Sequence, residues 1–215
     1  MKLLAIDTAT EACSCALFID GEILQRSQIA PRQHTNLILP MADELLKAAD
    51  LKANQLDGLA FGRGPGSFTG LRIASGVIQG IAFAADIPVA PISCLAALAQ
   101  AAYIEHSSEK VLAAIDARMD EVYFGSYIVD PAGIMRSHDT EIVCKPELIN
   151  IPTDGKWYGV GSGWATELGN MLPSYDADKY PQAAAIIPLA VAAFKEGNVV
   201  NAEQALPVYL RNKVT

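Results

Sequence analysis

A glycine-rich loop between a short strand and a long apolar helix constrains the fold of this chain more than any other feature. The apolar residues 59–61 predict a buried strand, and the segment Gly62-Arg-Gly-Pro-Gly66 follows at once. Three glycines within five residues permit positive φ angles and let the backbone come close to a neighbouring segment. A helix is expected over residues 69–85, and the free N–H groups of its first turn favour an anion. The loop therefore predicts either a tight structural turn or a contact with a phosphate group.

Two common nucleotide-binding motifs do not match this loop. A P-loop ends in Gly-Lys-Ser or Gly-Lys-Thr, and that ending is absent here. A dinucleotide fingerprint would carry its last glycine where this chain has Ser67. Ser67 or Thr69 can instead cap the helix that follows, because a hydroxyl oxygen accepts a hydrogen bond from the first helical turn.

The order of the predicted elements indicates a mixed-sheet α/β fold. Three strands come first, over residues 2–6, 13–19 and 22–28. Asp20-Gly21 lies between the last two and is a strong signal for a two-residue hairpin. Helices and strands then alternate, over residues 35–49 (helix), 59–61 (strand), 69–85 (helix), 88–90 (strand) and 93–103 (helix).

The same order restarts in the second half of the chain. A strand over residues 111–115 leads into Asp116, and its hairpin partner is expected over residues 122–129. Ala114-Ile-Asp116 corresponds to Leu4-Ala-Ile-Asp7, and the turn 130–133 takes the place of Asp20-Gly21. This restart predicts an internal duplication. We expect two lobes, over residues 1–106 and 107–215, with a further strand over 157–160 and a helix over 187–195.

Composition narrows the class of protein. The net charge is -8, with 24 acidic and 16 basic residues, and no Lys/Arg cluster stands out. Because nucleic-acid binding requires a basic surface, this chain is not expected to bind RNA strongly by itself. The four cysteines, at positions 13, 15, 94 and 144, form no Cys-x-x-Cys pair and have no histidine at ligand spacing. They predict free thiols in a reducing compartment rather than a zinc site.

No membrane span is expected. The N-terminal residues 1–7 predict a strand and not a signal peptide. The apolar segment 73–102 is long enough to cross a bilayer, but polar residues and prolines interrupt it at Gln79, Asp86, Pro88 and Pro91. We therefore expect a cytoplasmic protein.

The helix over residues 69–85 has an unusual number of small residues. Gly76 and Gly80 lie on one face and allow close approach of a second helix. This face either packs within its own lobe or, together with the helix over residues 35–49, forms a subunit interface. The interface alternative predicts contacts by Ile38, Met41, Leu45, Leu71, Ala74, Ser75, Gly76, Ile78 and Gly80.

Several motifs along the whole chain resemble the TsaB (YeaZ) family. They include the loop Gly62-Arg-Gly-Pro-Gly-Ser-Phe-Thr-Gly-Leu-Arg72, the segment Ile6-Asp7-Thr8-Ala9-Thr10, and His34 at the start of the first long helix. Asp116-Ala-Arg118 with Glu121-Val-Tyr123, and Pro207-Val-Tyr-Leu-Arg211, complete the set. The resemblance implies two actin-like (RNase H-like) lobes, which agrees with the predicted duplication.

The resemblance also implies a function. Members of this family are similar to TsaD, the subunit that transfers a threonylcarbamoyl group to adenosine 37 of tRNAs reading ANN codons. It implies a heterodimer with that paralogue, contact with the ATPase TsaE, and tRNA bound only through the complex. A homodimer is expected when the partner is absent. No tightly bound cofactor is expected, and ATP or ADP is expected, if anywhere, at the interface of the complex.

The paralogue's metal-binding histidine pair falls at Cys94 and Leu98 of this chain. Since leucine cannot bind a metal ion, the resemblance implies a partner without a metal site or catalytic residues of its own.

Two alternatives remain open from the residues. One is a glycoprotease-like peptidase, after a label that the family has carried, although no His-Glu-x-x-His motif is present. The other is a stand-alone ATPase of the actin-like fold, since Asp7 lies where such proteins position a metal-bound phosphate. Asp7 is equally suited to bond its own turn. The candidate phosphate or nucleotide contacts are Asp7, Thr8, Thr10, Gly64, Gly66 and Ser67.

Overall fold

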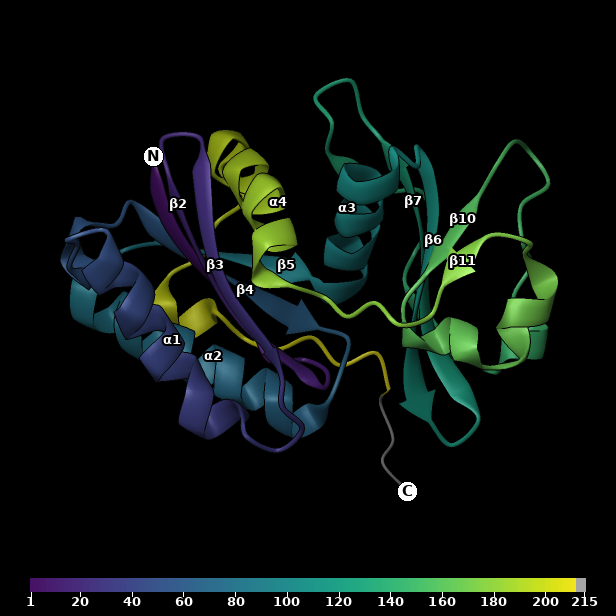
Figure 1. The fold of residues 1–215 in the computed structure, drawn as a ribbon, viewed down its shortest axis with the longest axis horizontal. Coiled ribbons are helices and arrows are strands. Elements are labelled where there is room, and N and C mark those ends of the chain that lie inside the picture. The colour runs from purple at the N-terminus through teal and green to yellow at the C-terminus, as the bar shows by residue number, and fades with distance from the viewer. Residues whose placement is uncertain (212–215) are drawn as a thin grey trace.

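The first hundred residues form a five-stranded mixed sheet with the strand order β3-β2-β1-β4-β5 (Figure 1). The first three strands are antiparallel neighbours, whereas β4 and β5 run parallel to β1. A computed structural model describes residues 1–211 of the chain. The elements of this part are β1 (Lys2–Asp7), β2 (Ala12–Ile19), β3 (Glu22–Ile29), α1 (His34–Ala48), β4 (Gly58–Gly64), α2 (Phe68–Ala85), β5 (Val89–Ser93) and α3 (Cys94–His106).

Local sequence explains the hairpin that starts this sheet. Asp20 and Gly21 both have positive φ angles, 48° and 110°, as the two-residue turn between β2 and β3 requires. Cys13, Cys15 and Leu17 alternate along β2 and are buried together beneath α1 and α2. The predicted hairpin is therefore confirmed, and Cys13 and Cys15 lie on one face of β2.

The second sheet repeats the topology of the first. Its order, β8-β7-β6-β10-β11, corresponds strand for strand to β3-β2-β1-β4-β5, with the same antiparallel and parallel neighbours. This correspondence confirms the predicted duplication. The elements are β6 (Lys110–Arg118), β7 (Glu121–Val129), β8 (Met135–Ser137), β9 (Ile142–Cys144), β10 (Tyr158–Val160) and β11 (Tyr175–Asp176). Of these, β9 pairs with β7 outside the main order.

The two sheets enclose a central helical layer. Helices α1 and α2 cover the outer face of the first sheet, and α4 (Ala183–Glu196) covers its inner face (Figure 1). Helix α3 packs against α4 on one side and against the second sheet on the other. The outer face of the second sheet carries short 3-10 turns, at Pro146–Leu148, Ser162–Ala165 and Glu167–Met171. The lobes therefore share one interior but differ in their outer cover.

The C-terminal part of the chain returns to the first lobe. Side chains of the first sheet accept hydrogen bonds from the first turn of α4: Ser14 Oγ from the Ala183 N–H, and Gln25 Oε1 from the Ala184 N–H. Val200 then pairs with Val89 at the edge of the sheet. Helix α4 and Val200, which their sequence position had assigned to the second lobe, thus pack on the first sheet.

The short elements of the second lobe differ most from the sequence expectation. Strands β8, β9 and β11 have two or three residues each, too few for a periodic signal. Helix α4 begins at Ala183 rather than at 187 because Ser14 and Gln25 satisfy its first N–H groups, and Pro188 lies inside it.

The long apolar segment 73–102 divides as expected, into α2, β5 and α3. Among the described residues, α2 is the one helix with the length and apolar composition of a membrane span, and here it covers a sheet. The four cysteines have free thiols.

The return of α4 predicts a large effect of one side chain. Ile186 is fully buried between α4 and the first sheet. Replacing it by alanine should lower the free energy of unfolding by about 2–5 kcal/mol, because a cavity remains. Urea denaturation followed by circular dichroism measures this loss. Lys195→Ala, at an exposed position of the same helix, is the control and should change it by less than about 0.5 kcal/mol. A loss equal to that of the control would contradict this packing.

Candidate interaction face and glycine-rich loop

The glycine-rich loop is held against the turn between β1 and β2. The Ser67 N–H donates to the Ala9 carbonyl oxygen at 2.7 Å, and the Thr8 hydroxyl donates to the Gly70 carbonyl oxygen at 2.7 Å. Ser67 is the N-cap of α2, and its Oγ accepts from the Gly70 N–H at 3.4 Å. These bonds fix the start of α2 on the first sheet.

Three glycines make this approach sterically possible. A Cβ at Gly62 would overlap the Asp7 carboxyl group and crowd Cys94 Sγ. A Cβ at Gly66 would overlap the Ala9 carbonyl oxygen, and one at Gly70 would overlap the Thr8 carbonyl oxygen. Since any other residue would push the two segments apart, the geometry supports the structural interpretation of the loop.

Asp7 is fully buried beneath this loop. Its Oδ1 accepts from the Ala9 N–H at 3.0 Å, and its Oδ2 accepts from the Cys94 thiol at 3.6 Å. Loss of solvation raises the Asp7 pKa from 3.8 to about 7, against the opposing effect of these two hydrogen bonds. Burial and the neighbouring Asp7 also raise the pKa of the Cys94 thiol. The carboxyl group thus bonds its own turn and a protonated thiol.

The six candidate phosphate contacts do not share an open surface. Asp7 and Thr8 are inaccessible to solvent, and the Thr8 hydroxyl is already bonded to α2. Thr10 is buried, and its hydroxyl has no partner among residues 1–211. Gly64 is buried under the Val208 carbonyl oxygen, and Gly66 is half-buried, whereas Ser67 is exposed. Of these six candidates, Ser67 alone is exposed and freely available to a nucleotide.

The candidate interface residues divide into two groups. Seven of the nine are buried within the first lobe: Ile38, Met41, Leu45, Leu71, Ala74, Ser75 and Ile78. Most of these pack against the first sheet, and the Ser75 hydroxyl donates to the Ala205 carbonyl oxygen at 2.7 Å. In this structure they stabilise the lobe and offer no surface to a partner. Gly76 and Gly80 are exposed, and a Cβ added at either would meet no atom within 4 Å.

Two exposed apolar side chains accompany these glycines. Phe83 on α2 is 83% exposed, and Leu39 on α1 is 52% exposed. Helices α1 and α2 lie side by side on the outer face of the sheet (Figure 1). We call the surface of Leu39, Gly76, Gly80 and Phe83 the exposed helix face. Sequence reasoning missed Leu39 and Phe83, although Phe83 follows Gly76 and Gly80 at the i+7 and i+3 helical spacing.

The positions of the paralogue's metal ligands are occupied by core residues. Cys94 bonds Asp7, and Leu98 is fully buried among the residues of α3 and the second sheet. Within residues 1–211, no three His, Cys, Asp or Glu side chains gather into a group that could hold a metal ion. In the same range, no serine side chain forms a hydrogen bond with a histidine side chain. The described residues thus do not present the usual parts of a metal or serine hydrolase.

Two duplicated mixed sheets around a shared helical layer define an actin-like, RNase H-like α/β protein. The sequence model of the family described as TsaD, tRNA N6-adenosine threonylcarbamoyltransferase, matches residues 24–152. The chain belongs to the TsaB family of tRNA threonylcarbamoyladenosine biosynthesis proteins.

Individual relatives support this assignment over the full length. TsaB of Escherichia coli strain K12 is 44% identical over all of this chain and 96% of its own length. TsaB of Haemophilus influenzae is 46% identical over all of this chain and 95% of its own length. The solved structure of YeaZ from Pseudomonas aeruginosa superposes with a TM-score of 0.93 at 48% identity, covering 97% of this chain and 99% of that one.

Burial of Asp7 predicts a specific dependence of stability on pH. The folded chain keeps a proton on Asp7 up to about pH 7, whereas an unfolded chain loses it near 3.8. The free energy of unfolding should therefore fall as the pH rises between these values and level off above about 7. Asp7→Asn keeps an oxygen that accepts from the Ala9 N–H, and its side chain cannot ionise. The free energy of unfolding of Asp7→Asn at pH 8 should therefore exceed that of the wild type by up to about 4 kcal/mol.

Urea denaturation at a series of pH values from 4 to 8 measures this difference. Asp50→Asn is the matched control, since Asp50 is an exposed turn residue with φ 52°, a conformation that asparagine also adopts. Parallel pH profiles of the wild type and Asp7→Asn would contradict a protonated buried carboxyl group.

Proposed function

We propose that this chain is a non-catalytic partner subunit in the synthesis of threonylcarbamoyladenosine at position 37 of tRNAs reading ANN codons. It binds the catalytic paralogue TsaD through the exposed helix face and activates it. Membership in the TsaB family supports the pathway. The single observation that carries the mode of action is the exposed helix face itself, which combines two exposed glycines of α2 with large exposed apolar side chains on α1 and α2.

The exposed helix face has the physical properties of a helix-pairing surface. Gly76 and Gly80 let a second helix come close, and Phe83 and Leu39 supply apolar area that water otherwise contacts. Asp43 and Lys47 form an ion pair on the solvent side of α1 and give this surface a polar border. A partner with the same fold would bring equivalent helices, so the two pairs would form a helix bundle about a pseudo-twofold axis.

The core positions of Cys94 and Leu98 support a role without chemistry. Binding would stabilise the active conformation of the paralogue and complete a docking surface for the ATPase TsaE. ATP or ADP would bind at the interface of the complex rather than tightly to this chain, and tRNA would be held only by the complex. This assembly belongs in the cytoplasm. The same face would support a homodimer when the paralogue is absent.

Reconstitution with purified components tests the activating role. Adding this chain to the paralogue, TsaE, tRNA and the threonylcarbamoyl donor should raise the rate of tRNA modification between about 5- and 150-fold, the range that coupling free energies of 1–3 kcal/mol produce. Mass spectrometry of digested tRNA measures the product. An equal rate without this chain would reject the partner role, and turnover by this chain alone would favour an enzyme.

One substitution tests the exposed helix face. Gly76→Leu should weaken binding to the paralogue at least tenfold, a loss of about 1.4 kcal/mol, because the side chain prevents close approach of the helices. The isolated chain has open space at this position and should stay folded. Lys195→Leu adds a similar side chain to an exposed position of α4 and should leave binding unchanged. Isothermal titration calorimetry decides the question, and unchanged affinity of Gly76→Leu would remove α2 from the interface.

A further inference from the structure

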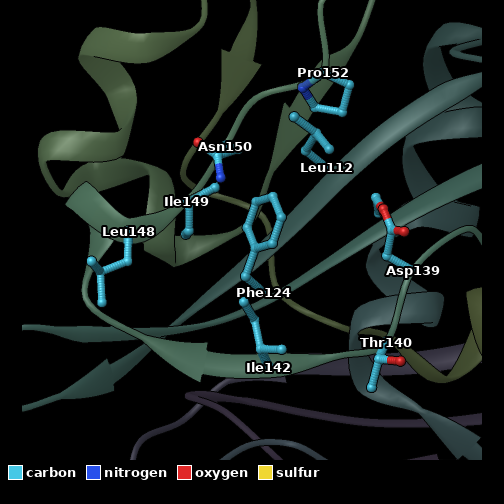
Figure 2. Close-up of a pocket in the computed structure, with 10 residues that line it drawn as sticks. Leu112, Phe124, Asp139, Thr140, Ile142, Leu148, Ile149, Asn150 and Pro152 are labelled. Atoms are coloured by element: carbon cyan, nitrogen blue, oxygen red, sulfur yellow. The ribbon is translucent and has the colours of Figure 1, made fainter.

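The second lobe has a hollow on the face of its sheet opposite to α3. Figure 2 shows side chains that line it. The cavity measures about 190 Å³ and lies between β6, β7 and the segment 139–152. The ring of Phe124 lies at its centre, with Leu112 and Pro152 on one side and Asp139 on another (Figure 2). Leu148 and Ile142 form an exposed apolar part of its rim. We call this cavity the second-lobe hollow.

The duplication explains why the hollow exists. In the first lobe, the connection from β3 to β4 contains the fifteen-residue helix α1, which covers the outer face of the sheet. The corresponding connection in the second lobe, from β8 to β10, contains only β9 and the 3-10 turn Pro146–Leu148. These short elements cover less of the sheet than a helix does, and they leave the space above Phe124 unfilled.

One carboxyl group faces this apolar space. Asp139 is exposed, and the hydroxyl of Ser126, itself 3% exposed, donates to its Oδ2 at 2.9 Å and orients the carboxyl group. Among residues 1–211, Asp139 Oδ1 accepts no hydrogen bond and Asp139 forms no ion pair. No lysine, arginine or histidine lines the hollow. The hollow thus combines an exposed acceptor, oriented by Ser126, with an aromatic wall.

These features fit a cation on an aliphatic stem. A guanidinium group donates to a carboxylate in a fixed geometry and also stacks on an aromatic ring, so Asp139 and Phe124 together suit arginine. The apolar wall suits the methylene groups of the stem. At about 190 Å³ the hollow is smaller than the roughly 300–1,000 Å³ of pockets for drug-sized ligands, and it matches a single side chain.

We propose that the second-lobe hollow binds an arginine side chain of a protein partner. The exposed rim residues Leu148 and Ile142 support a protein rather than a free small molecule, because a protein surface would cover them as it inserts the side chain. The net charge of -8 on the whole chain favours association with a basic segment. This surface is separate from the exposed helix face, so the proposal is independent of the pairing with the paralogue.

The test uses the full chain and two probes of equal shape. N-acetyl-arginine methylamide carries the guanidinium group, and N-acetyl-citrulline methylamide replaces it with a neutral urea group. In ¹H–¹⁵N NMR titrations, the arginine probe should shift the backbone amide signals of Phe124, Asp139 and Thr140. The citrulline probe should bind at least about tenfold more weakly, as expected when a charge-assisted hydrogen bond is lost. Equal binding of the two probes, or shifts confined to other residues, would overturn the proposal.

Variants and a third probe separate the remaining outcomes. Asp139→Asn should abolish the preference for arginine over citrulline. Glu147→Gln, a change at an exposed acidic residue that does not line the hollow, should leave it intact. The probe comparison on the unchanged chain remains decisive if Asp139→Asn does not fold. n-Propylguanidine carries the same guanidinium group and stem without a peptide backbone or a second charge, and tighter binding of n-propylguanidine than of the arginine probe would overturn the assignment to a protein partner.

Discussion

The close approach of the glycine-rich loop to the β1–β2 turn is the contact on which the position of the exposed helix face depends. The loop can reach this turn because Gly62, Gly66 and Gly70 have no Cβ. Two hydrogen bonds from Ser67 and Thr8 then fix the first turn of α2. Since the direction of a helix follows from its first turn, this contact also places Gly76, Gly80 and Phe83 on the outside of the lobe. The loop therefore determines the position of the exposed helix face through the geometry of its packing.

Both lobes have the same sheet topology, but different elements cover the outer faces of their sheets. The first sheet has two long helices on its outer face, and these helices expose apolar residues of their own. The second sheet has short 3-10 turns there, which leave the second-lobe hollow above Phe124. Helices α3 and α4 lie between the sheets and join both lobes into one interior. The two lobes therefore present two surfaces of different chemistry.

The candidate interface shows how far periodicity can predict a site. Both predicted helices exist, but helical spacing selects the apolar side chains, and seven of those nine residues pack inside the lobe. An apolar helix that covers a sheet packs most of its large apolar side chains into the core of its own lobe. The exposed surface of α1 and α2 is the face that does not pack on the sheet, where Gly76, Gly80, Phe83 and Leu39 lie. Periodicity marks this face through its small residues, and it cannot show which apolar face belongs to the core.

The sequence by itself determined the order of the long elements, the Asp20–Gly21 hairpin, the restart at Asp116 and the family. These features depend on short-range physics: turn residues that accept positive φ angles, and repeating apolar side chains. Only the tertiary structure decided that Asp7 is sealed beneath the loop, that α4 returns to the first sheet, and that a hollow forms over Phe124. Each of these depends on contacts between residues far apart in the chain, such as Asp7 with Cys94 and Ser14 with Ala183. Such long-range contacts decide whether a residue is buried and which groups surround it, and the local sequence does not specify them.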